Sequence, residues 1–142
     1  MKLIAYYSSQ TRSFNDDKLK DLVQHAIKKN KVENVTGILL SAGGCFFQII
    51  EGPIDVIDAL YAKIECDTRH AAISKVLDEE ITERRFPKWL MGGVTLDPEL
   101  AEHKPVFELS VQALNKKVTV PPFDILNILI NAFLKSSDQS IT

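Results

Sequence analysis

The sequence has 142 residues, of which 45% are hydrophobic and 25% are charged, as is ordinary for a globular protein that buries its own core. A formal net charge of −2 gives no electrostatic reason to expect a nucleic-acid partner, which requires a clustered basic surface. No apolar stretch is long enough to span a bilayer, so no membrane contact is predicted.

The amino-terminal residues enter a strand directly, without the apolar run and cleavage site of a signal peptide, and we therefore expect a cytoplasmic protein. Cys45 and Cys66 fit that compartment as free thiols. His25, His70 and His103 are scattered along the chain, and neither cysteine belongs to a C-x-x-C pair. No metal site is therefore predicted.

The first 96 residues predict strands and helices in the order β-α-β-β-α-β-β. Apolar residues recur at helical spacing along one face of residues 19–27 and of residues 57–64. The first helix is expected to end near Asn30, and the second is expected to begin at Pro53, which suits a first helical turn. The expected strands cover residues 3–8, 34–40, 45–50, 73–82 and 89–96, and Glu51-Gly52-Pro53 is expected to break the third of them.

The turn chemistry and the element order together predict the fold class. Ala42-Gly43-Gly44 predicts a tight hairpin, because glycine readily adopts the positive φ angles that such turns need. Two separated helices and antiparallel hairpins indicate an α+β sandwich with both helices on one sheet face, similar to a ferredoxin-like fold. In that fold the first and third strands are neighbours.

A glutamine, Gln48, stands in the middle of the most apolar predicted strand, between Phe47 and Ile49. A buried primary amide must find hydrogen-bond partners, because leaving it unpaired costs about 1–3 kcal/mol. One interpretation is a core glutamine bonded to nearby backbone. The other is a switch, since rotating an amide exchanges the donor and the acceptor that it offers to its neighbours.

Residues 97–142 are predicted to form a helical extension of a domain in residues 1–96. Short helices are expected at residues 97–102 and 106–114, and a longer helix at residues 123–135. The last helix is apolar over most of its circumference and needs cover on more than one side. It either closes the core by covering the sheet face that the first two helices leave bare, or it also contacts another subunit of a homo-oligomer.

A catalytic interpretation finds little support in the sequence. Ser8 and Ser9 lack a Gly-x-Ser-x-Gly elbow, and no Gly-rich phosphate loop precedes a helix. Arg69 and His70, which follow the second helix, fit a polar surface corner better than an anion site or a catalytic base. We therefore expect that the chain is not an enzyme.

Aromatic and amide groups on adjacent strands form the candidate binding site instead. Tyr7, Gln48 and either Trp89 or Met91 are expected to converge on the helix-covered face of the sheet. A flat apolar ligand would then fit between the two helices. The slot would be lined by apolar side chains, with polar groups at its mouth: Leu22, Val23 and Ile64, then Asn30 and Arg69.

Several motifs, in the right order and spacing over about residues 1–96, resemble the BLUF family of bacterial blue-light sensors that use flavin. They are Tyr7-Ser8-Ser9, Asn30, Val35-Thr36-Gly37-Ile38-Leu39, Phe46-Phe47-Gln48-Ile49-Ile50-Glu51-Gly52, Asp67-Thr68-Arg69-His70 and Arg84-Arg85-Phe86-Pro87-Lys88-Trp89-Leu90-Met91. Each piece is weak alone, and together they are specific.

The resemblance implies a non-covalently bound flavin, usually FAD and alternatively FMN or riboflavin, with its ring between the two helices. It implies that Tyr7 donates an electron and then a proton to the excited flavin. Gln48 would bridge that tyrosine and the flavin, and Asn30 would hold the edge of the ring. Contacts to other parts of the cofactor are implied for Lys63, Arg69 and His70.

The resemblance also implies how the signal leaves the site. Trp89 and Met91 match residues proposed to exchange places near the glutamine. The last strand leads directly into the carboxy-terminal helices, so a changed hydrogen-bond pattern at Gln48 would bias those helices and signal to a separate partner protein.

Two alternatives belong to other functional classes. The first is a light-insensitive ferredoxin-like module that binds a ligand or serves assembly, and it predicts a colourless protein that forms a defined oligomer. The second is a small hydrolase that uses Arg69 and His70, and it predicts phosphatase turnover that Arg69→Ala abolishes.

Overall fold

The computed structural model describes residues 1–10, 16–67, 70–115 and 117–135. The strands are β1 (Lys2–Gln10), β2 (Thr36–Ala42), β3 (Cys45–Gly52), β4 (His70–Glu80) and β5 (Gly92–Thr95). The helices are α1 (Asp16–Glu33), α2 (Ile54–Glu65), the 3₁₀ turn η1 (Ala101–His103), α3 (Lys104–Leu114) and α4 (Pro122–Lys135).

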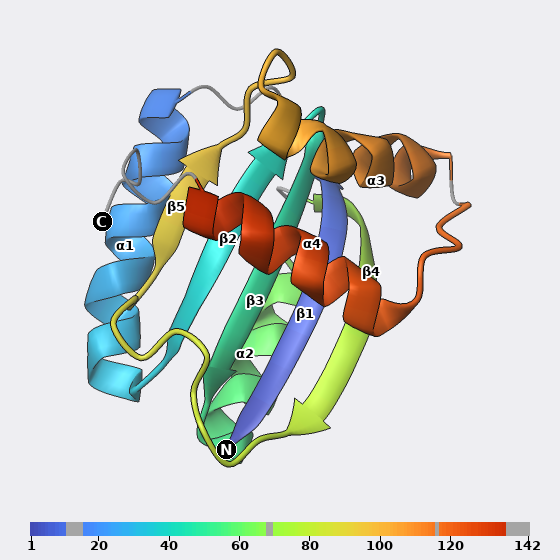
Figure 1. Cartoon of the computed structure of the whole chain (residues 1–142). Helices are drawn as coiled ribbons and strands as arrows, with labels where there is room; N and C mark the ends of the chain where they lie inside the picture. The colour runs from blue at the N-terminus through green and yellow to red at the C-terminus, as the bar shows by residue number, and fades with distance from the viewer. Residues whose placement is uncertain (11–15, 68–69, 116, 136–142) are drawn as a thin grey trace.

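The strands form one sheet in the order β4-β1-β3-β2-β5 (Figure 1). β1 lies between β3 and β4 and is antiparallel to both, β2 and β3 form an antiparallel hairpin, and β5 pairs with β2 in parallel. The helices α1 and α2 cover one face of this sheet, and α3 and α4 lie across the other face. The ferredoxin-like α+β class predicted from the sequence is confirmed.

Left-handed backbone conformations set two of the element boundaries. Gly43 and Gly44, with φ angles of 55° and 86°, form the predicted turn between β2 and β3. Helix α1 continues past Asn30 to Glu33, and the next residue, Asn34, has a φ of 62°. Asparagine tolerates that conformation, which ends a helix. Asn30 therefore lies inside α1 rather than at its end.

The two faces of the sheet carry separate hydrophobic cores, because strand residues alternate between the faces. Along β3, Phe46 and Ile50 belong to the core beneath α1 and α2, whereas Phe47 and Ile49 belong to the core beneath α3 and α4. Strand β2 is buried along its whole length, since both of its faces are covered.

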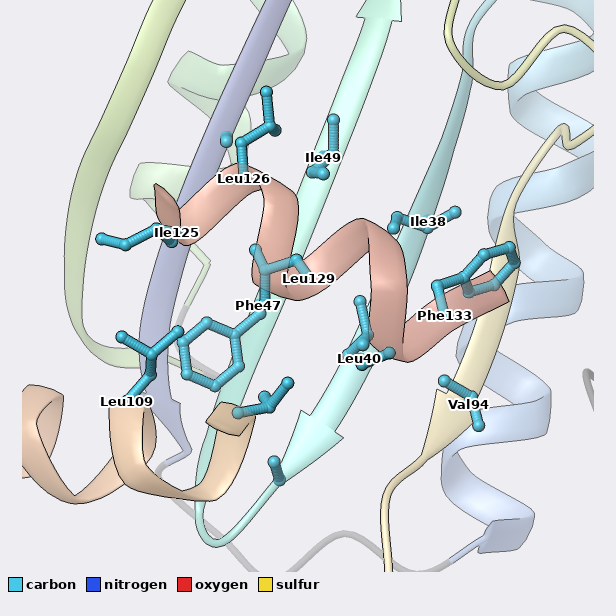
Figure 2. Close-up of a cluster of buried hydrophobic side chains, with 14 of the residues drawn as sticks. Ile38, Leu40, Phe47, Ile49, Val94, Leu109, Ile125, Leu126, Leu129 and Phe133 are labelled. Carbon is cyan, nitrogen blue, oxygen red and sulfur yellow. The ribbon is translucent and has the colours of Figure 1, made fainter. Parts of the chain in front are cut away.

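Helix α4 crosses the sheet on the face opposite α1 and α2, and its apolar side chains point toward the strands (Figure 2). Leu129 and Phe133 from the helix lie in one core with Ile38 and Leu40 of β2 and with Phe47 of β3. The helix thus closes this face of the molecule. A contact of α4 with another subunit of a homo-oligomer stays a prediction. The division of the chain into residues 1–96 and 97–142 also stays a prediction.

The segment before β5 is the clearest departure from the predicted elements. A strand was expected from residue 89, but the ladder with β2 covers only Gly92–Thr95 and residues 81–91 form an irregular connection. Side chains rather than a neighbouring strand hold parts of this connection, because Glu51 binds the amide of Phe86 and Asn30 binds the carbonyl of Leu90. Among the described residues, none of the helices has the length and apolarity required to cross a membrane.

Candidate functional site

The site is centred on Gln48, which lies opposite Tyr6 of β1 and Leu39 of β2 in the sheet. The Tyr6 hydroxyl donates a hydrogen bond to Gln48 Oε1. Gln48 Nε2 lies 3.6 Å from Met91 Sδ. A thioether sulfur is a weak acceptor, so the amide hydrogens of Gln48 lack a strong partner within the described part of the chain.

The tyrosine beside Gln48 is therefore Tyr6, and the prediction that Tyr7 converges with Gln48 is wrong. Side chains of a strand alternate between its faces, and Tyr7 points to the opposite side of the sheet. There its ring packs against Phe47, with the ring centroids 6.1 Å apart. Tyr6 is 2% exposed in the core beneath α1 and α2.

The sequence does not show which of the two adjacent tyrosines shares a sheet face with Gln48, because the middle of β1 is apolar on both faces. Leu3 and Ala5 share the face of Tyr7, and Ile4 shares the face of Tyr6, so within residues 3–7 no polar position marks an outer face. The pairing register supplies the missing information, since it sets Tyr6 opposite Gln48 and Tyr7 opposite Phe47.

Asn30 connects α1 to the segment that precedes β5. Its side chain is 3% exposed, and Nδ2 donates a 2.6 Å hydrogen bond to the carbonyl oxygen of Leu90. Asn30 and Gln48 thus hold two consecutive residues, Leu90 and Met91. The two carboxamides come from different elements and meet at the same short stretch of chain.

Met91, not Trp89, faces Gln48. Met91 is 1% exposed in the core beneath α1 and α2. Trp89 packs on the other face of the sheet, where its ring meets Phe133 of α4 edge to face with the centroids 5.2 Å apart. The backbone of Trp89 is held in place as well, because its carbonyl accepts a 2.9 Å hydrogen bond from the Gly37 amide.

The remaining predicted residues fall into three groups. Leu22 of α1 and Ile64 of α2 are partly buried and pack against the core that contains Val23. Lys63 is exposed and lines a cavity of ≈ 250 Å³ between the end of α1 and α2. Arg69 and the side chain of His70 lie outside the described residues. The full cavity lining is Glu33, Asp55, Val56, Ala59, Leu60 and Lys63.

A second tyrosine, which the sequence predicted only as part of the buried face of the second helix, packs against Tyr6. The ring of Tyr61 on α2 meets the Tyr6 ring edge to face, with centroids 5.6 Å apart. Lys75 Nζ lies 4.6 Å from the centroid of the Tyr61 ring. Burial and the nearby carboxylates of Glu65 and Asp78 raise the pKa of Tyr61, which keeps this phenol neutral.

The donor set fits a flavin better than a metal ion. Gln48 and Asn30 present carboxamides, and Tyr6 presents a phenol, beside apolar walls from two helices. Planar amides pair well with the carbonyl and ring-nitrogen edge of a flat heterocycle. Within the described ranges, no group of three or more His, Cys, Asp or Glu side chains is placed to hold a metal ion.

Comparison with known proteins identifies relatives of this arrangement. The family model for BLUF, described as sensors of blue-light using FAD, matches residues 1–92. BlrB, a BLUF protein solved in its dark state, superposes with a TM-score of 0.70 at 31% sequence identity, over 78% of this chain and 83% of BlrB.

Curated relatives are longer proteins. Photoactivated adenylate cyclase subunit beta of Euglena gracilis is 32% identical over 93 residues, which is 65% of this chain and 11% of the cyclase subunit. The blue light- and temperature-regulated antirepressor BluF of Escherichia coli strain K12 is 31% identical over 123 residues, which is 87% of this chain and 30% of the antirepressor. The chain thus spans less than a third of either relative.

Proposed function

The chain belongs to the BLUF family of blue-light sensors that use FAD, and from that premise we propose that it senses light through the hydrogen bond between Tyr6 and Gln48. The observation that carries the proposal is this bond, together with the contact of the same amide with Met91. BLUF domains are photosensors and not enzymes, which agrees with the lack of a catalytic motif in the sequence.

The cofactor would lie between α1 and α2. The carboxamides of Gln48 and Asn30 would orient its polar edge, and Leu22 and Ile64 would cover its faces. Lys63, at the cavity between the helices, would contact its polar tail. The family resemblance gives the same role to Arg69 and His70. When bound, the flavin supplies the absorption of blue light and, once excited, a strong oxidant.

Tyr6 would serve as the electron donor. After giving an electron to the excited flavin, the Tyr6 phenol would be a strong acid and would release its proton along the existing hydrogen bond toward Gln48 Oε1. Loss of the phenol as donor would leave the Gln48 amide free to rotate or tautomerise. Return of the electron and the proton to Tyr6 would restore both oxidation states and leave only the amide rearranged. The neutral phenol of Tyr61 would take no part in the electron or proton transfer, and its ring would hold the Tyr6 ring in place.

Reorientation of Gln48 would change its contact with Met91, and the segment from Trp89 to Gly92 would carry the change across the sheet. Trp89 and Gly92 both contact Phe133 of α4; a Cβ added at Gly92 would lie 2.5 Å from the Phe133 ring. Helix α4 is thus the element best placed to pass the signal to a separate protein. The BluF relative, an antirepressor, supports an output through protein–protein contact.

The absorption spectrum of the purified chain tests this function. The protein should be yellow, and blue light should shift its flavin band reversibly to the red, because a reoriented Gln48 amide would donate a hydrogen bond to the cofactor. Gln48→Ala should bind flavin and lose the shift. A colourless protein that binds no added FAD, or a Gln48→Ala variant with a normal shift, would contradict the proposal.

A further inference from the structure

A buried carboxylate outside the light-sensing site anchors the segment that carries Trp89 and Met91. Glu51 is the next-to-last residue of β3, is 0% exposed, and points to the sheet face opposite Gln48. Charged side chains are almost never fully buried unless they are paired or fully hydrogen-bonded. The partners of Glu51 therefore indicate what it does.

The carboxylate accepts three hydrogen bonds, two of them from the backbone amides of consecutive residues. Oε1 accepts from the Phe86 amide at 2.7 Å and from Thr36 Oγ1 at 2.9 Å, and Oε2 accepts from the Arg85 amide at 2.9 Å. Bonds to an ionised acceptor are stronger than neutral ones. Glu51 thus replaces, for residues 85 and 86, the strand partner that this irregular connection lacks.

Arg84 extends the anchor to two further elements. Its guanidinium donates to Thr36 Oγ1 at 2.9 Å, to the Glu51 carbonyl at 3.3 Å and to the Asn34 carbonyl at 2.7 Å. The beginning of the connection is therefore tied at once to the start of β2, the end of β3 and the end of α1. Phe86 adds packing, since its ring meets Phe133 with centroids 6.3 Å apart.

The chain is fixed a second time where β5 begins, because Gly92 and Gly93 pair with Ile38 and Leu39 of β2. Residues 87–91, which we call the switch segment, lie between these two fixed points and include both Trp89 and Met91. The side chains of Gln48 and Asn30 hold this segment from the light-sensing side, and within it the Trp89 carbonyl accepts a hydrogen bond from the Gly37 amide of β2. Any rearrangement that starts at Gln48 is confined to a short span with anchored ends.

We infer that Glu51 is a positioning residue for light sensing, because its carboxylate fixes one end of the switch segment and so restricts the motion to residues 87–91. The effect of Glu51 on light sensing rests on the proposed function. The anchoring of the segment by Glu51 does not depend on flavin. Removing the charge should loosen the switch segment without altering the Tyr6–Gln48 pair on the opposite face.

Amide hydrogen exchange tests the anchoring without any photochemistry. In the wild-type chain the amides of Arg85 and Phe86 should exchange slowly although they belong to no helix or strand. Glu51→Gln keeps the shape but presents a donor to one of the backbone amides, so both amides should exchange about tenfold faster or more, relative to the core amides of β1. Glu83→Gln, an exposed carboxyl in the same connection, should change nothing.

Trp89 gives a second readout, because it is the single tryptophan of the chain. In Glu51→Gln its fluorescence should move to longer wavelength and be quenched more readily by iodide, as the ring leaves Phe133. Thr36→Val, which removes one of the three donors and preserves side-chain shape, should show the same changes at smaller size. If Glu51→Gln fails to fold, the Thr36→Val variant serves for the same test.

The light response distinguishes a positioning role of Glu51 from a contribution to stability alone. In Glu51→Gln the red shift should still form, since Tyr6 and Gln48 are intact, but its return in the dark should be faster by about tenfold because the switch segment has lost the carboxylate anchor at its amino-terminal end. Wild-type exchange at Phe86 together with wild-type Trp89 emission in both variants would overturn the inference. A chain without a red shift would defeat the proposed function and leave the exchange result standing.

Discussion

At the scale of single residues, the site depends on two carboxamides that hold consecutive positions of the chain. Asn30 binds the Leu90 carbonyl and Gln48 contacts the Met91 sulfur. Each amide keeps hydrogen-bonding capacity beyond these contacts, since a carboxamide offers two donors and two acceptor lone pairs. This spare capacity is what a flavin edge would use.

Asn30→Ala should weaken flavin binding by about tenfold to a hundredfold, because it removes a buried hydrogen-bonding group worth roughly 1–3 kcal/mol. The affinity follows from a titration in which flavin fluorescence is quenched on binding. Lys29→Ala, at the exposed neighbouring position, is the control and should bind as the wild type does. Equal flavin affinities of the two variants would show that Asn30 does not contribute to flavin binding.

At the scale of elements, one aromatic side chain couples α4 to β5, where it lies against Gly92, and to the connection that precedes β5. Phe133 of α4 is 0% exposed and meets both Trp89 and Phe86 edge to face. On the other side of β5, a Cβ added at Gly93 would lie 2.3 Å from Val23 of α1. The strand therefore has no room to shift without moving a helix on one of its faces.

Phe133→Ala should lower the free energy of unfolding by about 3–5 kcal/mol, as expected for truncating a fully buried phenylalanine. Equilibrium urea unfolding followed by circular dichroism measures this change. Leu134→Ala is the matched control, because Leu134 is the next residue and is 56% exposed, and it should cost no more than about 0.5 kcal/mol. Comparable losses in the two variants would contradict the packing of α4 described here.

At the scale of the whole molecule, the order of elements and the fold class were predictable because the signals are local. Helical periodicity, a Gly-Gly hairpin and an apolar strand around Gln48 each depend on neighbouring residues only. Which face of β1 carries Tyr6 was not predictable, because it depends on pairing with β3 and both faces are apolar. The role of Glu51 was missed for the same reason, since its partners at residues 84–86 are distant in sequence.

Flavin should stabilise the entire fold, because it would fill a slot between two helices that pack on the same core. A ligand that binds only the native state adds about 2.7 kcal/mol to the free energy of unfolding at a hundred times its dissociation constant. The melting temperature of the flavin-free chain should therefore rise steadily with added FAD. Adenosine alone, which lacks the ring system, should leave it unchanged.

The pairing of Tyr6 with Gln48 is tested most directly by comparing two conservative substitutions at adjacent positions. Tyr6→Phe removes the phenol that donates to Gln48, and Tyr7→Phe removes the phenol on the opposite sheet face. Both variants should bind flavin, and light–dark difference spectra should show the red shift abolished in Tyr6→Phe and retained in Tyr7→Phe. A normal shift in Tyr6→Phe, or its loss in Tyr7→Phe alone, would contradict the account.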